Sequence, residues 1–225
     1  MLKKEIKKII EKSKKWGWVL EPDAQEIFSL YGFKTPTYAV ALSNDQAITI
    51  AGKIGYPVVA KIVSPAIVHK SDVKGVVVGI KDDQTLLQTL DRFRKLDGFV
   101  GMLIAEMVKG LELIIGAKND LQFGPMILLG MGGVGVEIYK DGSLRMAPLK
   151  TRDADHMIHE LVAGKLLTGY RGAEPINMNS LKKVIVNFSR LMMDLQDIVE
   201  SVDLNPVICT AKACTIVDSR IMLKK

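Results

Sequence analysis

A lysine and a histidine eight residues apart carry the clearest chemistry in this chain. Lys61 lies inside the apolar, β-branched run Val58–Val63, which is typical of a buried strand. Burying an ammonium group is costly unless an anion meets it. Pro65 then ends the regular structure, and a His-Lys-Ser-Asp cluster follows at 69–72 in a loop. A buried cation beside an imidazole and small polar groups indicates phosphate chemistry.

The histidine of this cluster, His69, has two interpretations. A lone histidine is usually a surface loop residue or a hydrogen-bonded core residue. In the functional interpretation, His69 accepts a phosphoryl group and becomes a covalent phosphohistidine. Neutral imidazole is a competent nucleophile near pH 7 because its pKa lies close by. His156 and His159 are three residues apart on a predicted helix and lack a third ligand, so we predict no zinc site there.

Three oxygen-bearing side chains near the C-terminal end form a second candidate group. Asp203 and Asn205 end one predicted strand, and Asp218 ends another about a hairpin later. Alternation places Asp203 and Asn205 on the same side of the strand, and the hairpin would bring Asp218 close to them. Carboxylate and amide oxygens with room for water and phosphate suit Mg²⁺. Because Asn-Pro is also a common turn pair, an ordinary turn stays the alternative.

Two glycine-containing segments are further candidates. Residues 130–135 contain G-x-G-x-x-G, but a dinucleotide site needs that string between a strand and a helix, and 136–139 is predicted as another strand. We therefore exclude a dinucleotide site. Four glycines in six residues carry an entropic cost, which favours a turn that borders a ligand over a structural hairpin. Residues 71–76 join two strands, and their N–H groups can cradle phosphate, although the string alone favours an ordinary polar hairpin.

The elements that must position these residues alternate between helical and strand patterns. The predicted helices cover 1–15, 23–31, 44–54, 83–95, 153–167 and 180–196, and the third opens with a capping box from Ser43 to Gln46. The predicted strands cover 38–42, 58–63, 76–80, 100–107, 112–118, 126–129, 136–139, 144–147, 199–204, 207–210 and 215–217. The pattern predicts an α+β, or mixed α/β, fold with much antiparallel sheet.

A composition shift near 98–101 is the predicted boundary between two lobes. We expect a helical N-terminal extension over 1–20, a first lobe over 21–99 and a second lobe over 100–225. The N-terminal extension is basic, and its apolar residues fall at helical spacing, so it is predicted to be an amphipathic surface helix.

Bulk properties limit the class of protein. A net charge of +6 and a pI of about 9.2 suit a phosphorylated small molecule, a nucleic acid or an acidic partner. Aromatic residues make up 6% of the chain and no basic–aromatic stripe occurs, so we expect no nucleic-acid binding. No apolar run approaches the ~20 residues of a membrane span, and the N-terminal segment is not a secretory signal. The two cysteines, Cys209 and Cys214, fit unpaired thiols in the cytoplasm, although a cross-strand disulfide between them stays open.

Six short motifs in a fixed order carry a family resemblance: Tyr56-Pro57-Val58-Val59-Ala60-Lys61, His69-Lys70-Ser71-Asp72, Phe123-Gly124-Pro125, Gly132-Gly133, Arg145-Met146-Ala147-Pro148-Leu149 and Asp203-Leu204-Asn205-Pro206. Together they resemble the β subunit of ADP-forming acetate–CoA ligase, an ATP-grasp protein akin to the succinyl-CoA synthetase β chain. The resemblance covers about residues 21 to 223. It implies an ATP-grasp fold, with nucleotide between two lobes, and the reaction acetyl-CoA + ADP + phosphate ⇌ acetate + CoA + ATP.

The resemblance also implies which residues bind the nucleotide, ATP or ADP. Lys61 corresponds to the lysine that holds the nucleotide phosphates. Glu106, Met107 and Val108 correspond to the hinge at the adenine, and Glu112 takes a ribose position.

A further set of residues is implied for phosphoryl transfer. His69 corresponds to the histidine that relays the phosphoryl group to ADP, and Asp203 stands where related chains carry a glutamate that positions the phosphohistidine. Asn205 and Asp218 correspond to Mg²⁺ ligands, and Arg145 would neutralise phosphate charge. This division suits phosphoryl transfer, in which positioning and charge neutralisation do most of the catalysis.

The glycine loop that follows His69 departs from the family pattern. The family continues Asp-Val-Gly-Gly-Val, whereas this chain has Asp72-Val73-Lys74-Gly75-Val76. Lys74 removes one position that freely adopts left-handed backbone, and it adds a cation for phosphate or shifts the loop. Ser71 and Gly75 are the loop residues expected to meet phosphate.

The resemblance implies a separate α subunit that carries the CoA and acyl phosphate sites, in a heterotetramer. Two alternatives stay open on the sequence. A stand-alone ATP-grasp carboxylate ligase would not need His69. A nucleotide-sensing module without turnover would need neither His69 nor the metal pair, so the joint presence of Lys61, His69, Asn205 and Asp218 argues against it.

Overall fold

The computed structural model describes residues 3–133 and 141–224. The chain forms two compact units, each built from more than one segment. The larger unit comprises Met1–Val19, Asp23–Thr35 and Lys109–Lys225, and the smaller unit comprises Leu20–Pro22 and Pro36–Val108. These bounds differ from the expected lobes at 21–99 and 100–225, because the strand Gly101–Glu106 pairs in the middle of the smaller unit's sheet.

The smaller unit has a four-stranded antiparallel sheet in the order β2-β5-β3-β4. Its strands are β2 (Tyr38–Ala41), β3 (Val58–Val63), β4 (Val76–Ile80) and β5 (Gly101–Glu106). Two helices, α3 (Asn44–Ile54) and α4 (Asp83–Phe93), pack against this sheet. Helix α3 begins with the predicted cap, since the Ser43 hydroxyl accepts from the Gln46 N–H at 3.3 Å. Asp82 caps α4 in the same way, accepting from the Thr85 N–H at 2.7 Å.

The two faces of this small sheet differ in what they contact. Val58, Ala60 and Ile62 of β3 belong to the apolar cluster under α3 and α4. Alternation therefore turns Lys61 to the opposite face, although it is as buried as its apolar neighbours.

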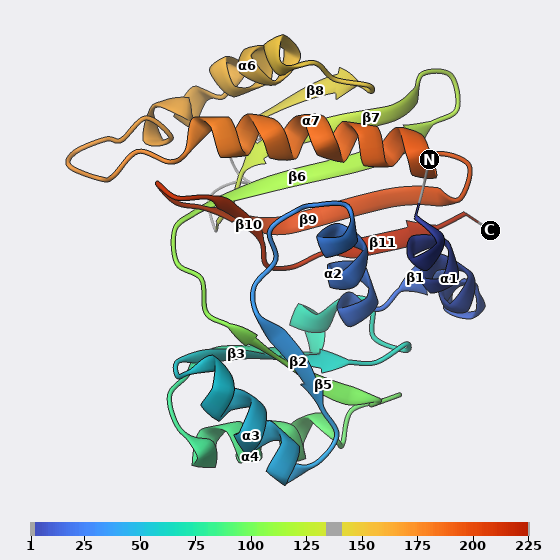
Figure 1. Cartoon of the computed structure of the whole chain (residues 1–225), viewed down its shortest axis with the longest axis vertical. Helices are drawn as coiled ribbons and strands as arrows, with labels where there is room; N and C mark the ends of the chain where they lie inside the picture. Colours follow the sequence, from blue (N-terminus) through green and yellow to red (C-terminus); the bar gives the residue numbers. More distant parts are fainter. Residues whose placement is uncertain (1–2, 134–140, 225) are drawn as a thin grey trace. The chain divides into compact units, whose positions relative to one another are not determined.

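The larger unit has a seven-stranded antiparallel sheet in the order β1-β11-β9-β6-β7-β8, with β10 also paired to β9 (Figure 1). Its strands are β1 (Trp18–Val19), β6 (Leu111–Asp120), β7 (Gly124–Met131), β8 (Gly142–Met146), β9 (Val199–Cys209), β10 (Cys214–Ile216) and β11 (Arg220–Leu223). One apolar core joins this sheet to α1 (Lys4–Ser13), α2 (Glu21–Leu30), α6 (Thr151–Glu160) and α7 (Met178–Leu195).

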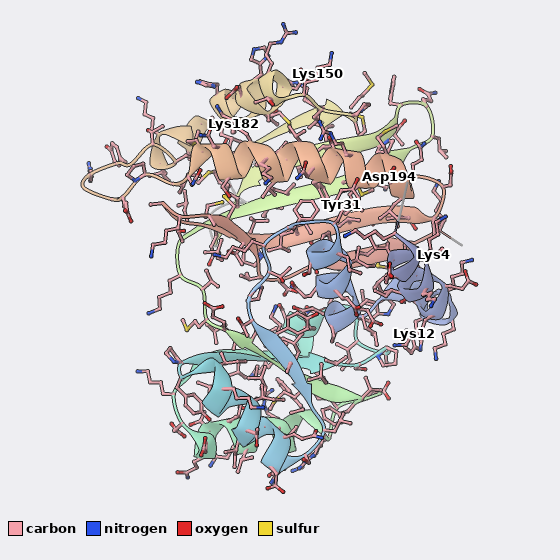
Figure 2. All side chains as sticks on the ribbon, in the orientation of Figure 1. Lys4, Lys12, Tyr31, Lys150, Lys182 and Asp194 are labelled. Atoms are coloured by element: carbon pink, nitrogen blue, oxygen red, sulfur yellow. The ribbon has the colours of Figure 1, made fainter. Side chains whose placement is uncertain are left out.

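Helix α7 lies across this sheet, as Figure 1 shows. Its predicted apolar stripe is confirmed, since Leu181, Ile185, Phe188 and Leu191 are fully buried. At the end of α2, the Tyr31 hydroxyl donates to Asp194 of α7 at 2.9 Å (Figure 2). Burial and this hydrogen bond raise the pKa of Tyr31 to about 12.

The structure differs from the predicted elements in one helix, in one pair of strands and in two short strands that the sequence did not indicate. The helix predicted over 153–167 is two pieces, α6 and a 3-10 helix at Val162–Leu166, because the Asp141 carboxylate accepts from the Val162 and Ala163 N–H groups at 2.7 and 2.8 Å and starts a new turn. The strands predicted at 199–204 and 207–210 are the single strand β9. Strands β1 and β11 were not predicted, and the strand predicted at 136–139 lies outside the described residues.

The glycines at the end of β7 have a packing explanation. The Gly132 N–H donates to the Glu112 carbonyl at 2.8 Å, and a Cβ on Gly132 would lie 2.7 Å from the carbonyl carbon of Glu112. Gly133 has φ +96°, which favours glycine. These two positions therefore need glycine whether or not a ligand borders the turn.

The cysteines Cys209 and Cys214 face each other across β9 and β10, and both are buried as free thiols. Within the described part of the chain, no helix combines the length and the apolar composition that crossing a membrane requires.

Candidate functional site

The buried lysine of β3 is paired with an anion that the sequence analysis did not identify. Lys61 Nζ lies 2.5 Å from Oε1 of Glu21, the first residue of α2. Each of these two residues is 4% exposed. The expectation that an anion meets Lys61 is thus satisfied within the chain itself. An acidic residue in the first turn of a helix is common for reasons of helix polarity, so the local pattern did not single out Glu21.

A second lysine meets the same carboxylate. Lys70 Nζ lies 2.7 Å from Oε2 of Glu21, and its side chain is 12% exposed. Glu21 therefore bridges Lys61 on β3 and Lys70 on the segment after it, with one oxygen for each ammonium group.

The relay candidate His69 immediately precedes a short 3-10 helix, Lys70–Val73, and its side chain is exposed. The turn after this helix is tight, since the Gly75 N–H donates to the Lys70 carbonyl at 2.6 Å. A Cβ on Gly75 would lie 2.6 Å from Ile62 Cγ2, so this position requires glycine. Lys74 adopts φ +52° and ψ +35°, the left-handed conformation that the family pattern fills with glycine. Lys74 therefore occupies a left-handed position of this turn, and Ser71 is exposed on the same turn.

The predicted adenine hinge follows directly from β5. The Glu106 N–H donates to the Thr37 carbonyl at 2.8 Å, and the Glu106 carboxylate accepts from the Thr37 N–H at 3.3 Å. Met107 and Val108 are half-buried, and Met107 Sδ lies 3.9 Å from the point where a Cβ on Gly79 would stand. Lys61, His69, Ser71, Gly75 and the hinge thus all lie in the smaller unit.

The predicted metal residues lie in the larger unit, at a break in the pairing of β9. Residues Val199–Asp203 pair with β11 and Val207–Cys209 pair with β10, so the stretch between them faces the connection between those two strands. There the Asn205 N–H donates to the Asp218 carbonyl at 3.2 Å. The predicted closeness of Asn205 and Asp218 is therefore confirmed at the level of the backbone.

Alternation along β9 also follows the prediction. Asp203 and Asn205 are half-buried and exposed, whereas Val202 and Leu204 belong to the core. Asp203 has a partner that the sequence analysis missed, since Arg220 of β11 stands opposite it with Nη2 and Oδ2 3.7 Å apart.

The donor set at this place fits magnesium better than a transition metal. Asn205 and Asp218 offer amide and carboxylate oxygens, and one Asp218 oxygen accepts from the Ser219 N–H at 2.8 Å. Within residues 3–133 and 141–224, no group of three or more His, Cys, Asp and Glu side chains could enclose a metal. Mg²⁺ commonly binds through one or two protein oxygens, with water and phosphate completing the octahedron, so two donors suffice.

Arg145 is not placed with these residues. Its register partners across the sheet are Ile127, then Ala117, then Val202, which belong to the helix-covered core face. Asp203 is in register with Gly116, Leu128 and Leu144 on the opposite face.

The Arg145 guanidinium also pairs with Glu160 of α6. The Ser143 hydroxyl and then Arg145 hold the pKa of Glu160 below its usual range. Arg145 therefore ties β8 to α6 through Glu160, and its expected role in phosphate neutralisation stays a prediction.

Two other features lie on this sheet. Glu112, the ribose candidate, is exposed near the start of β6. The open face of β6–β8 is hollowed by about 470 Å³ between Gly116, Lys118, Met126, Leu128 and Leu144. The hollow borders Gly116, the register partner of Asp203, but none of the predicted site residues lines it.

The fold thus has two antiparallel sheets, with a buried lysine on the smaller sheet and Asn205 beside Asp218 at the larger one. Residues 11–223 match the model of the ATP-grasp domain family, to which the chain therefore belongs. Within it, the chain is similar to the ADP-forming acetate–CoA ligase I subunit beta of Pyrococcus furiosus, with 41% identity over 96% of this chain and 97% of that subunit.

Two further similarities extend the comparison. The 4-hydroxybutyrate–CoA ligase (ADP-forming) of Nitrosopumilus maritimus is 41% identical over 98% of this chain, which spans only 33% of that longer protein. A structure of the dinucleotide forming acetyl-coenzyme A synthetase 1 of Ca. Korarchaeum cryptofilum, in complex with coenzyme A and Mg-AMPPCP, superposes with a TM-score of 0.84. It is 36% identical and covers 97% of this chain and 100% of that one. The predicted ATP-grasp fold and family are confirmed.

Proposed function

We propose that this chain is the nucleotide-binding subunit of an ADP-forming acyl-CoA ligase of the acetate type. It would take part in the reaction acetyl-CoA + ADP + phosphate ⇌ acetate + CoA + ATP. One observation carries the proposal: a buried lysine on β3 and an exposed histidine directly before the following 3-10 helix stand in one compact unit. The similarity to ADP-forming ligase subunits over almost the whole chain supports it.

The smaller unit would bind ADP and carry the phosphoryl group. Lys61 would meet the nucleotide phosphates, and the turn that contains Ser71 and Gly75 would add to that site. Backbone groups of Glu106, Met107 and Val108 would meet the adenine edge.

The larger unit would supply charge and metal ligands. Asn205 and Asp218 would hold Mg²⁺, which when bound neutralises the charge of nucleotide phosphates. Asp203 would orient the phosphohistidine, and Glu112 would accept from ribose hydroxyls. Arg145, which pairs with Glu160 in this structure, would neutralise phosphate charge only by leaving that pair.

His69 would carry the phosphoryl group in the step that forms ATP. An oxygen of the ADP β-phosphate attacks the phosphorus atom, the new O–P bond forms, and the N–P bond to the imidazole breaks. The leaving imidazole takes up a proton and is neutral again. The exposed position of His69 suits a group that must receive phosphoryl from one molecule and give it to another.

A partner α subunit would supply the CoA and acyl phosphate sites, with a heterotetramer as the expected assembly. The similar subunit of Pyrococcus furiosus is itself named as a beta subunit. The two buried free thiols are consistent with the cytoplasm as the place of action.

The test isolates the step assigned to this chain. The purified protein is phosphorylated with phosphoramidate, which transfers phosphoryl to histidine and releases ammonia, and is then mixed with Mg²⁺ and ADP. ATP formation is followed in a single turnover. We expect ATP from the wild type and from His159→Ala, a control that removes another exposed histidine. We expect none from His69→Ala. A wild type that forms no ATP, or a His69→Ala variant that forms as much, would overturn the proposal.

A further inference from the structure

We propose that Glu21 and Lys70 are positioning residues, through which the carboxylate of Glu21 sets the place of His69 relative to Lys61. The inference rests on the proposed function of His69, and it assigns that site two residues to which the family resemblance gave no role.

The bridge has a defined geometry. Oε1 of Glu21 is 2.5 Å from Lys61 Nζ and Oε2 is 2.7 Å from Lys70 Nζ. The exposed fractions of the three side chains are 4% for Glu21, 5% for Lys61 and 12% for Lys70. Screening by water is weak at such burial, so the two short contacts hold both ammonium groups to one carboxylate.

The bridge joins the two parts of the proposed mechanism. Lys61 belongs to β3, where its backbone is fixed by pairing with both β4 and β5. Lys70 begins the 3-10 helix, and its carbonyl accepts from the Gly75 N–H at 2.6 Å. Lys70 is therefore held at its backbone by Gly75 and at its side-chain end by Glu21. His69 is the preceding residue, with its Cα about 3.8 Å from that of Lys70, so its place follows from theirs.

Stability alone does not account for these charges. Replacing a buried ion pair by well-packed apolar groups is often neutral or stabilising, and the best-attested use of such pairs is to select one arrangement. Here the arrangement selected is that of a phosphate-binding lysine on a strand and a phosphoryl-carrying histidine on the next segment. Phosphoryl transfer depends on such alignment, and misplacement by about 1 Å can slow a reaction by roughly a hundredfold.

The test uses the single-turnover formation of ATP from the phosphorylated chain, with ADP affinity measured separately by calorimetry. Lys70→Met removes the tether but leaves Glu21 paired with Lys61. We expect ATP to form roughly ten- to a hundredfold more slowly at saturating ADP, with the dissociation constant for ADP within about twofold of the wild type. Lys70→Arg keeps a cation that reaches the carboxylate, and we expect it to restore most of the rate. Lys53→Met makes the same exchange on an exposed face of α3 and should change neither quantity.

A second variant tests the carboxylate itself. Glu21→Gln loses the bridge to both lysines, so we expect a slower transfer together with weaker ADP binding. If Lys70→Met does not fold, Lys70→Gln takes its place.

The outcomes separate the two proposals. ATP formation by His69→Ala would overturn the proposed function. A requirement for His69, combined with wild-type transfer in Lys70→Met or with no recovery in Lys70→Arg, would overturn the positioning role and leave the function intact.

Discussion

Replacing Lys74 by glycine should stabilise this protein, although it removes a charged side chain and introduces the most flexible residue. Lys74 sits at φ +52° and ψ +35°, just after the 3-10 helix that follows His69. For an L-residue, this left-handed conformation costs roughly 1–2 kcal/mol because Cβ approaches the following carbonyl oxygen. Its backbone contacts do not depend on the side chain, since the Lys74 carbonyl accepts from Arg92 at 2.8 Å and its N–H donates to the Ser71 carbonyl at 3.0 Å.

The expected gain is the relief of strain minus the entropy that glycine adds to the unfolded chain. That entropy amounts to roughly 0.4–1 kcal/mol, so Lys74→Gly should raise the free energy of unfolding by about 0.5–1 kcal/mol. For a chain of this length, 1 kcal/mol shifts the thermal midpoint by roughly 2–4 °C. Differential scanning calorimetry at neutral pH measures this shift directly.

Two matched variants make the test specific. Arg171 has φ +51°, so Arg171→Gly should also be stabilising, less the loss of its contact over the Tyr170 ring. Lys53→Gly makes the same exchange inside α3, where glycine costs roughly 1 kcal/mol, so it should lower the midpoint. If Lys74→Gly lowers the midpoint as Lys53→Gly does, the left-handed turn is not a source of strain and the reasoning fails.

Three other outcomes follow from contacts described above. Gly75→Ala should destabilise the protein by roughly 1–3 kcal/mol in urea titrations, because the new Cβ would overlap the Ile62 side chain. Gly52→Ala, with open space around it, should not destabilise the protein. Equal effects of the two substitutions would refute this reasoning. Asp82 accepts backbone hydrogen bonds that lower its pKa, so its stabilisation of α4 is present above the unfolded pKa and lost as pH falls through the folded one. The thermal midpoint of Asp82→Ala should therefore lie below that of the wild type at pH 7 and approach it in acid; a constant gap would contradict the assignment. Cys209 and Cys214 should resist iodoacetamide until the protein unfolds, because both thiols are buried. The hydrogen bond with Cys214 and burial also raise the pKa of the Cys209 thiol. Rapid alkylation of the native protein would count against this prediction.

Local patterns predicted the elements that are long and periodic. Val58–Val63 and Val76–Ile80 are strands with the predicted bounds, and α7 deviates by two residues at its start. Strand β1 has two residues and β11 has four, too few for alternation to stand out from the surrounding sequence. Strand β9 continues through Asn205-Pro206, where a turn was the expected alternative, because β10 and β11 share its edge on either side of that dipeptide.

The sequence predicted those features of the candidate site that depend on neighbouring residues, and missed the contacts between residues far apart in the chain. The burial of Lys61 followed from its apolar neighbours, but its partner Glu21 is 40 residues away and has an ordinary helix-start context. Arg145 carried a motif resemblance, yet only the register with Ile127 shows that it faces the helices. Pairing across the sheet is non-local information, which a single sequence does not contain.

The pairing of β1 with β11 bears on the order in which the chain can fold during synthesis. Trp18 and Val19 are translated long before their register partners Met222 and Ile221. The smaller unit lies within residues 20–108 and can close its sheet while the rest is still being made. The apolar face of α1 must instead wait for its sheet, so it is the surface that a ribosome-associated chaperone would have to shield for longest.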